Sequence, residues 1–596
     1  MFGIRLHASR RHERRHEAQR GLSVAAVCAA AFLCANPVDR AIACTVIAVG
    51  KNASSDGSVI VTHANDGMRD FRVVRVPGKR HPNNAQRAVY YDYSANGYLA
   101  EYGGVPYLRY VGKDRGPAYE SKKLAPNTPI GHIPQVARCY TYFEGTYPIM
   151  NEKQLSIGET TCPSKVTPKP DGSKRLFYSA ELMRVAMERC DNALAAVRLV
   201  GALIDQYGYY GTGECLVIAD TNEIWVMEMT GYAADGTGGL WVAKRVPDDA
   251  VFASANLFRI RVVETNSADM LYSANLFAMC EQLGWWHPSD GPLDWLTAVT
   301  TGESGHPYAC IRRVWRIFSL VAPSTNLSPT VTGWQTTAYP FAMKPDQKLS
   351  VQDVFALHRD RYQGTDFDLT KGLAAQAAGD PVRFDIQNGV KVNGAFERSI
   401  SFFRSNYINV NQARGWLPNA AGGLMWIGFN EADRNCFMPV HVGVKRMPQL
   451  LERGDYLHCT MQCAWWVFQL VCDTISKRYD LAMPDVRAQQ AALENSSLAM
   501  VQELDAQARA GRASRGLLTR FADQRARAVT TAWKELWAAL QVKFLKNFMV
   551  DAQGNMTKLG YPAFWLENCG YTNGPIRYAT DDTQAPATNC WPDFDP

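Results

Sequence analysis

Cys44 directly follows Ala41-Ile42-Ala43, the small-x-small pattern after which a signal peptidase cleaves. A cut at this point would make Cys44 the first residue of the mature chain. The thiol of a terminal cysteine lies within reach of its own α-amino group, whose pKa is ordinarily about 7.7–8.0. The amine can take the thiol proton and later protonate a leaving amine, so no separate histidine base is required. These residue types predict a thiol nucleophile for amide hydrolysis.

The 43 residues before Cys44 have the features of an export signal, and we interpret 1–43 as a signal peptide. A charged stretch ends at Arg20, and an apolar run follows from Gly21 to Ala35. This run is shorter than the roughly 20 residues that span a bilayer. A lipoprotein signal would also place a cysteine after the cut, but such signals usually have Leu where this chain has Ala41. We therefore expect a secreted or periplasmic protein with no membrane span after removal of the signal.

The charge of the chain gives no sign of a nucleic-acid partner. The formal net charge is +6, but residues 1–43 hold seven arginines against three acidic residues, which leaves +2 for the rest. This small excess is not concentrated in a basic block. Because nucleic-acid binding needs a concentrated cationic face, we expect no nucleic-acid partner.

The pattern of apolar residues predicts strands interrupted by pairs of helices. Thr45–Val49 and Ser58–Thr62 are β-rich runs on either side of a turn-like segment, and they predict a hairpin. Apolar spacing predicts two helices within Ser179–Tyr207 and another over 309–321. Further strand-like runs are Leu216–Ala219, Glu223–Met229, Leu240–Lys244, Val251–Ala255, Gly423–Gly428 and Phe437–Val444. Such a mixture favours an α+β layered architecture.

The last third of the chain differs in composition. Ala488–Phe548 is rich in Ala, Arg, Glu, Gln and Leu, and a break near Gly511–Gly516 predicts two long helices. We divide the mature chain into a hydrolase domain, 44–480, and a helical C-terminal region with a cysteine-containing tail, 481–596. These helices are packing or oligomerisation elements in this interpretation, so a homo-oligomer is possible.

Five segments resemble a known family in their order along the chain. The run ACTVIAVGKNASSDGSVIVTHANDG (43–67) resembles the opening of the cysteine dipeptidases of the N-terminal-nucleophile class, of the dipeptidase A type. The other segments are MNEKQLSIGETT (150–161), the meander GECLVIADTNEIWVMEMTG (213–231) with WVAKRVPDD (241–249) and ASAN (253–256), CIRRVWRIFSLVAPS (310–324), and LPNAAGGLMWIGF (417–429). The resemblance covers residues 44 to about 450, and penicillin V acylases and bile-salt hydrolases are similar at a greater distance.

The resemblance implies a fold, a reaction and a site. The fold would be a four-layer αββα N-terminal-nucleophile sandwich with a helical C-terminal extension. The reaction would be hydrolysis of dipeptides through an acyl-enzyme on Cys44, without metal or organic cofactor. Asp66 would orient the α-amino group, and Asn151 and Asn256 would offer oxyanion donors or position the substrate. Arg313 would lie beside the thiol and favour its anionic form.

Each of these residues also has a structural alternative. Asp66 lies in an Asn-Asp-Gly run that favours a turn. Asn151 and Asn256 could simply end strands, and Arg312 could take the place of Arg313 because both lie on one expected helix. A run around His458 resembles a metal-binding cluster but lacks a second ligand pair, so we expect no zinc there.

His63 is a departure from the family pattern. Many relatives carry Arg three residues before the residue equivalent to Asp66, and this chain carries His63 there. An imidazole is shorter than a guanidinium and is cationic only below about pH 6.5. His63 can still form a hydrogen bond near the nucleophile, so we include it among the candidate catalytic residues.

Two other functions remain open from the sequence. One is hydrolysis of an N-acyl amide, as in penicillin V acylases and bile-salt hydrolases. The other is a non-catalytic binding protein that keeps the fold, against which Cys44 directly behind a cleavage pattern argues.

We expect the His63→Arg variant to retain activity and the His63→Ala variant to lose part of it, because only arginine can replace the polar group near the thiol. The measurement is kcat/KM on an amide substrate. No effect in either variant would remove His63 from the site.

Overall fold

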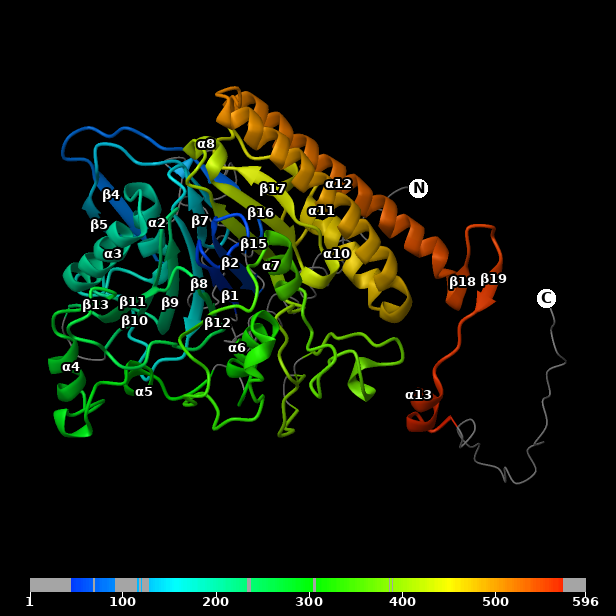
Figure 1. The fold of residues 1–596 in the computed structure, drawn as a ribbon, viewed down its shortest axis with the longest axis horizontal. Helices are drawn as coiled ribbons and strands as arrows, with labels where there is room; N and C mark the ends of the chain where they lie inside the picture. Colours follow the sequence, from blue (N-terminus) through cyan, green and yellow to red (C-terminus); the bar gives the residue numbers. More distant parts are fainter. Residues whose placement is uncertain are drawn as a thin grey trace, which may run out of the picture.

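Two antiparallel sheets face one another in the computed structural model of the chain, and helices lie on their outer sides (Figure 1). The structure describes residues 44–67, 70–91, 115–116, 119, 128–232, 237–303, 307–384, 386–387 and 390–571. The predicted signal peptide, 1–43, lies outside these residues. Within them, no helix combines the length and the apolar character needed to cross a bilayer.

The first sheet contains the strand that follows Cys44. Among the described residues it has seven strands, and its central strands β1, β2 and β15 are buried along their whole length. Their order across the sheet is β14 (Ala342–Met343), β12 (Val251–Ser254), β1 (Val46–Val49), β2 (Val59–Asp66), β15 (Ser405–Ala413), β16 (Leu424–Phe429) and β17 (Met438–His441).

The second sheet has eight strands in the described part of the chain. Their order is β13 (Met270–Tyr272), β11 (Leu240–Val246), β10 (Ile224–Thr230), β9 (Gly213–Ala219), β8 (Ser156–Cys162), β7 (Pro148–Asn151), β6 (Tyr142–Glu144) and β3 (Val74–Val76). Pairing between β8 and β9 is continuous, but β7 and β8 share only the pair Met150↔Ser156.

Helices cover the outer faces of both sheets. On the second sheet, α2 (Ser179–Arg189) contacts β7, and α3 (Ala193–Tyr207) contacts β9, β10 and β11. On the first sheet, α6 (Ile311–Val321) contacts β12, and α7 (Val351–His358) contacts β15. Smaller elements are α4 (Leu276–Gln282), α5 (Trp295–Val299), α8 (Asn419–Gly422), α9 (Gln449–Glu452), α13 (Ala563–Asn568) and the hairpins β4 (Gln86–Tyr90) with β5 (Pro129–Pro134) and β18 (Phe548–Val550) with β19 (Met556–Lys558).

Three long elements form the C-terminal helical layer. They are α10 (Ala464–Ile475), α11 (Tyr479–Arg509) and α12 (Arg515–Lys543), and Figure 1 shows them beside one another. The two predicted helices and the break between them are confirmed, although α11 begins earlier than expected and contains Pro484. Because α11 and α12 pack against β17, the predicted boundary at residue 480 falls at the start of a helix that covers the first sheet.

The chain leaves the meander at β12. The predicted hairpin of β1 with β2 is confirmed, as are the runs that form β9, β10 and β11. The expectation that Val251–Ala255 continues the same meander is wrong, because β12 pairs with β1 in the other sheet. This crossover brings Ser254 opposite Val46, and the following residues beside Cys44.

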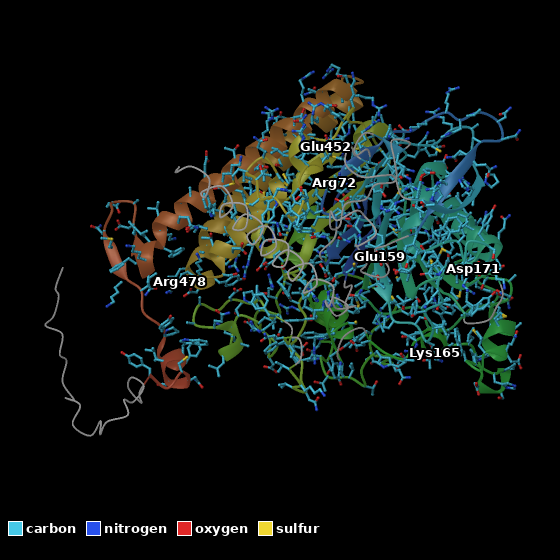
Figure 2. All side chains as sticks on the ribbon, turned by 180° about the vertical axis from the view of Figure 1, so that it is seen from behind. Arg72, Glu159, Lys165, Asp171, Glu452 and Arg478 are labelled. Atoms are coloured by element: carbon cyan, nitrogen blue, oxygen red, sulfur yellow. The ribbon has the colours of Figure 1, made fainter. Side chains whose placement is uncertain are left out.

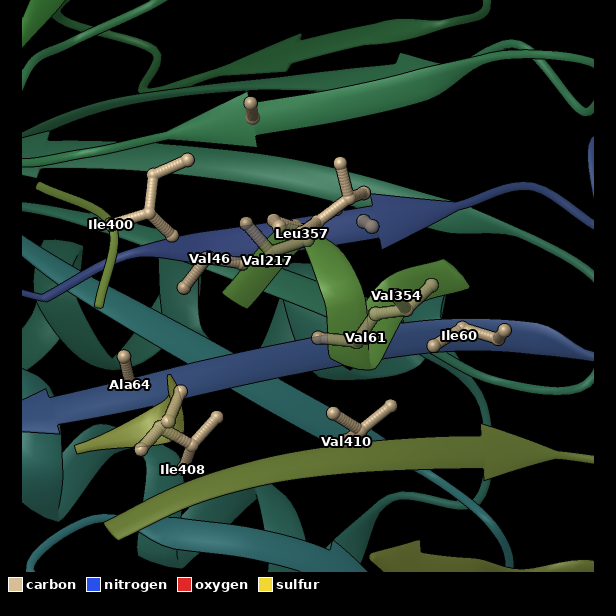
Figure 3. Close-up of a cluster of buried hydrophobic side chains, with 14 of the residues drawn as sticks. Val46, Ile60, Val61, Ala64, Val217, Val354, Leu357, Ile400, Ile408 and Val410 are labelled. Carbon is tan, nitrogen blue, oxygen red and sulfur yellow. The ribbon is translucent and has the colours of Figure 1, made fainter. Parts of the chain in front are cut away.

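The two sheets meet closely at Gly158. A Cβ placed on this residue of β8 would lie 2.4 Å from the carbonyl oxygen of Thr62 and 3.0 Å from the side chain of Val46. On the far side of β2 and β15, α7 covers the first sheet, and Figure 3 shows Val354 and Leu357 of that helix in one buried cluster with the strand residues. The absence of a side chain at Gly158 therefore sets how closely β8 approaches β2.

We expect the Gly158→Val variant to lose about 1–3 kcal/mol of unfolding free energy or more, because the new side chain has no space between the sheets. Urea unfolding measures this loss. Gly560→Val is the matched control, since a Cβ there meets nothing within 4 Å. Equal urea midpoints for the two variants would contradict the close contact.

Candidate active site

Cys44 lies at the start of β1, on the face of the first sheet that meets the second sheet. It is completely buried. The next residue, Thr45, forms a bridge with Ala64 of β2, whose amide donates to the Thr45 carbonyl over 2.9 Å. Since side chains alternate along a strand, Cys44 shares its face with His63 and Asn65, and not with Ala64.

Asn256 and Arg313 hold the backbone of Cys44. The Cys44 nitrogen donates to Asn256 Oδ1 over 3.0 Å, and Arg313 Nη1 donates to the Cys44 carbonyl oxygen over 3.0 Å. Asn256 follows β12 in the left-handed conformation that asparagine tolerates well, and its Nδ2 donates to the Thr161 carbonyl. The structure thus brings together three of the sequence-predicted residues.

All five N–H groups of Arg313 have oxygen acceptors. The guanidinium is fully buried, and it also donates to Thr45 Oγ1 and Asn256 Oδ1. The remaining two bonds go to the carbonyl oxygens of Ala309 and Ala255. Five donors in a planar fork are what only arginine offers, so Arg313 positions the start of the strand. The alternative Arg312 instead donates to the Pro329 carbonyl and lies over the ring of Phe367.

His63 faces a carboxylate of the second sheet. Its Nε2 lies 3.4 Å from Glu159 Oε2, and both side chains are almost wholly enclosed. The ring also contacts Tyr147 edge-on, with centroids 5.4 Å apart. One ligand atom each from Cys44, His63 and Glu159 lies within 4.8 Å of the other two, and this is the group in the described residues that could hold a metal ion. Figure 2 shows Glu159 in the interior, between α10–α12 and α2–α3.

Glu159 belongs to a buried pair of carboxyl groups. Burial raises the pKa of Glu159, but the contacts with Glu214 and His63 outweigh burial and hold that pKa below its usual value. Burial and the neighbouring Glu159 raise the pKa of Glu214 well above its ordinary value. The two pKa values are therefore shifted in opposite directions, which favours the negative charge on Glu159 over Glu214. Tyr178 donates a further hydrogen bond to Glu214.

Asp66 lies at the end of β2 and is paired with a cation. Arg398 Nη2 donates to its Oδ2 over 3.0 Å, and the hydroxyl of Ser405 donates to its Oδ1. Burial raises the pKa of Asp66 above its ordinary value, although Arg398 and Ser405 oppose the rise. These contacts anchor Asp66 near Cys44 but are not the predicted bond to its nitrogen, which goes to Asn256.

The structure does not place Asn151 among the groups around Cys44. Its Nδ2 donates to the carbonyl oxygens of Met187 and Cys190 at the end of α2, over 3.0 and 2.8 Å. Its Oδ1 accepts the amides of Lys153 and Leu155 in the turn before β8. Both donors are used locally, which favours a structural role, and the oxyanion role of Asn151 stays a prediction. A structural role at the end of a strand was the alternative that the sequence left open for Asn151.

Sequence reasoning missed three polar residues of the same region. Glu159 lies in the segment 150–161 that resembles the family, but no feature of the sequence assigned it a role. Asn65 and Asn409 are buried on the face that carries His63, since His63 pairs with Asn409 across β2 and β15. Neither amide atom of Asn65 has a hydrogen-bond partner, and Nδ2 of Asn409 has none. The alternation of His63 and Asn65 along a buried strand was the signal available, because both then share one face.

The sequence model of peptidase family C69 matches residues 146–492, more than half of the chain. The chain belongs to peptidase family C69. The resemblance drawn from the motifs is thereby confirmed, and a member of a peptidase family is a hydrolase. The matched range begins after the segment around Cys44, so it says nothing of the nucleophile.

Curated relatives of this C69 peptidase carry dipeptidase names. A probable dipeptidase of Salmonella dublin is 25% identical over 428 residues, which are 70% of this chain and 84% of that protein. A probable dipeptidase of Latilactobacillus sakei is 24% identical over 73% of this chain and 82% of that protein, and a dipeptidase of Bifidobacterium longum is 24% identical over 72% and 77%. A solved structure of penicillin V acylase from Agrobacterium tumefaciens shares 9% identity over 67% of this chain and 86% of that chain, with a TM-score of 0.26.

We expect Asn256 and Asn151 to respond oppositely to substitution. Asn256→Gly keeps the left-handed backbone but removes the acceptor for Cys44, so kcat/KM should fall by about 100-fold. Asn151→Ala leaves four backbone groups without their partner and should cost about 1–3 kcal/mol of stability or more, with a much smaller effect on kcat/KM. Steady-state kinetics and urea unfolding of both variants separate the two roles. A loss of activity in Asn151→Ala without a loss of stability would restore its catalytic role.

Proposed function

We propose that this C69 peptidase is an exported dipeptidase that uses Cys44 as an N-terminal nucleophile. The observation that carries the proposal is the clamp of Asn256 and Arg313 on the backbone of Cys44. The clamp fixes the position of Cys44. If Cys44 becomes the first residue of the chain, it supplies both the thiol nucleophile and the amine base. The dipeptidase names of the relatives support the substrate class. We also assign the two facing sheets and their outer helices to the four-layer αββα class.

The proposed reaction begins once residues 1–43 are removed. The α-amino group of Cys44 takes the thiol proton, and the thiolate attacks the carbonyl carbon of the dipeptide. The tetrahedral oxyanion then collapses, the C–N bond breaks, and the leaving amine receives the proton held by the α-amino group. Water hydrolyses the resulting thioester and releases the second amino acid, which restores the thiol.

Polar groups on the inner face of the first sheet serve this reaction. Asn65 lies beside Cys44 with an amide that has no partner in the structure, and it replaces Asn151 as the candidate oxyanion donor. Asn256 keeps the nitrogen of Cys44 in place, and Asp66 with Arg398 provides a charged pair at the end of the same strand. His63 adds a second polar group near the thiol, backed by Glu159.

We expect the exported protein to begin at Cys44, and we expect Cys44→Ala to abolish hydrolysis of a dipeptide panel. Cys44→Ser should keep at most a trace, because a hydroxyl is the weaker nucleophile. N-terminal sequencing and kcat/KM are the measurements. The exposed Cys459→Ser is the matched control and should leave kcat/KM unchanged.

The same assay discriminates between the other two functions. Cleavage of penicillin V without cleavage of any dipeptide would assign the chain to the acylases. Loss of neither activity in Cys44→Ala, or full activity in a protein that still carries residues before Cys44, would overturn the nucleophile. Binding of dipeptides without turnover would indicate a non-catalytic binding protein that keeps the fold of the family.

A further inference from the structure

Three different metal-binding side chains converge beside the nucleophile. The ligand atoms of Cys44, His63 and Glu159 lie within 4.8 Å of one another, and all three residues are buried. They come from three separate strands or strand ends, so the fold alone brings them together. A thiolate, an imidazole and a carboxylate are the ligands that Zn²⁺ takes in proteins.

His63 Nε2 and Glu159 Oε2 are both enclosed by protein. Their contact with one another is an ion-pair contact that does not meet the geometry of a regular hydrogen bond. They face one another across 3.4 Å. Buried polar atoms of this kind need an explanation, and a bound ion is one of the few that physical chemistry offers.

The spacing fits a tetrahedral ion. Two ligands that are each about 2.1 Å from a tetrahedral Zn²⁺ lie roughly 3.4 Å apart. That is the separation of His63 Nε2 and Glu159 Oε2. A thiolate bound at about 2.3 Å lies roughly 3.6 Å from either atom. This is shorter than the 4.8 Å within which the three ligand atoms lie, so Cys44 Sγ moves toward the other two ligands on binding.

The surroundings hold the carboxylate ready. Thr161 Oγ1 donates to Glu159 Oε1 over 2.9 Å, which leaves Oε2 turned toward His63. Glu214 is the carboxyl group next to Glu159, and Tyr178 donates a hydrogen bond to it. Such outer contacts orient a metal ligand and tune its affinity.

We propose that Cys44, His63 and Glu159 form a Zn²⁺ site that reversibly blocks the nucleophile. The ion displaces the thiol proton to solvent and bonds to the sulfur, so one thiolate and one carboxylate balance its two charges. Three protein ligands leave one tetrahedral position to water, which is the ligand count of an exchangeable site. The binding site stands on the geometry alone, whereas the block of hydrolysis rests on the proposed function of Cys44.

His63 is the residue that makes the site possible. An arginine at this position would carry a fixed positive charge and no lone pair, so it could neither bind the ion nor tolerate it nearby. The residues around His458 do not form a comparable enclosed metal site. The imidazole of His458 is 77% exposed, and the thiol of the nearby Cys463 donates to a backbone carbonyl.

The test uses the full chain expressed with its export signal, purified, and stripped with a chelator. The exposed Cys459 and Cys569 are changed to serine to remove competing thiols. Co²⁺ is titrated as a spectroscopic probe and Zn²⁺ by calorimetry, and dipeptide hydrolysis is followed in parallel. We expect one ion per chain, a thiolate-to-Co²⁺ charge-transfer band, and loss of hydrolysis that a chelator reverses.

Variants connect the signal to the three ligands. Cys44→Ala should abolish the band, and Glu159→Gln and His63→Arg should each weaken binding by about tenfold or more. His287→Arg is the matched control, because His287 lies at the same 3.4 Å from Glu281 but is 62% exposed. It should change neither the band nor the affinity. Urea unfolding checks that each variant is folded.

The outcomes separate this site from the proposed function. Active protein without stoichiometric binding, or a folded His63→Arg variant that binds Co²⁺ as the parent does, overturns the site and leaves the dipeptidase standing. A band that depends on Cys44 in a protein that hydrolyses no dipeptide supports the site and overturns the function. Hydrolysis that requires added Zn²⁺ overturns the blocking role.

Discussion

A single buried guanidinium fixes the geometry around Cys44. Arg313 uses its five N–H groups on oxygen acceptors from three parts of the chain: the start of β1, the end of β12 and the turn before α6. A buried cation is costly unless each of its donors is satisfied, so these acceptors must lie where they do for the fold to be stable. The position of Cys44 is therefore a condition of folding.

The inner face of the first sheet is unusually polar for the middle of a protein. His63, Asn65 and Asn409 lie there with Glu159 opposite, and several of their atoms have no partner in the structure. Burying polar groups without hydrogen-bond partners lowers the stability of the fold, and apolar side chains of the same shape would not do so. Groups that lower stability without local compensation are expected where a ligand or a reacting group completes their hydrogen bonds.

The sequence predicted local structure well and long-range placement poorly. The β1–β2 hairpin, α2, α3 and α6 follow from the spacing of apolar residues, which is a local property. The position of β12 in the other sheet does not follow from local spacing, because it depends on pairing with β1, about 200 residues away in the sequence. Asn256, Arg313 and Asn151 were predicted through a resemblance. The structure places the first two against Cys44, whereas the amide of Asn151 is used at the end of α2 and in a turn. Glu159 could not be recognised, since its contact with His63 exists only once both sheets are stacked.

β1, which follows Cys44, pairs with β12, and β2 pairs with β15. The strands around the Cys44 thiol are therefore complete only when the chain has been synthesised to residue 413. Contacts between segments so distant in sequence form slowly, because closing such large loops costs entropy before any pairing repays it. A ribosome must release more than two thirds of this polypeptide before the strands around Cys44 can assemble. A nascent chain that has not yet reached the end of β15 therefore lacks the strands that enclose Cys44, and under the proposed function topology alone keeps it inactive until then.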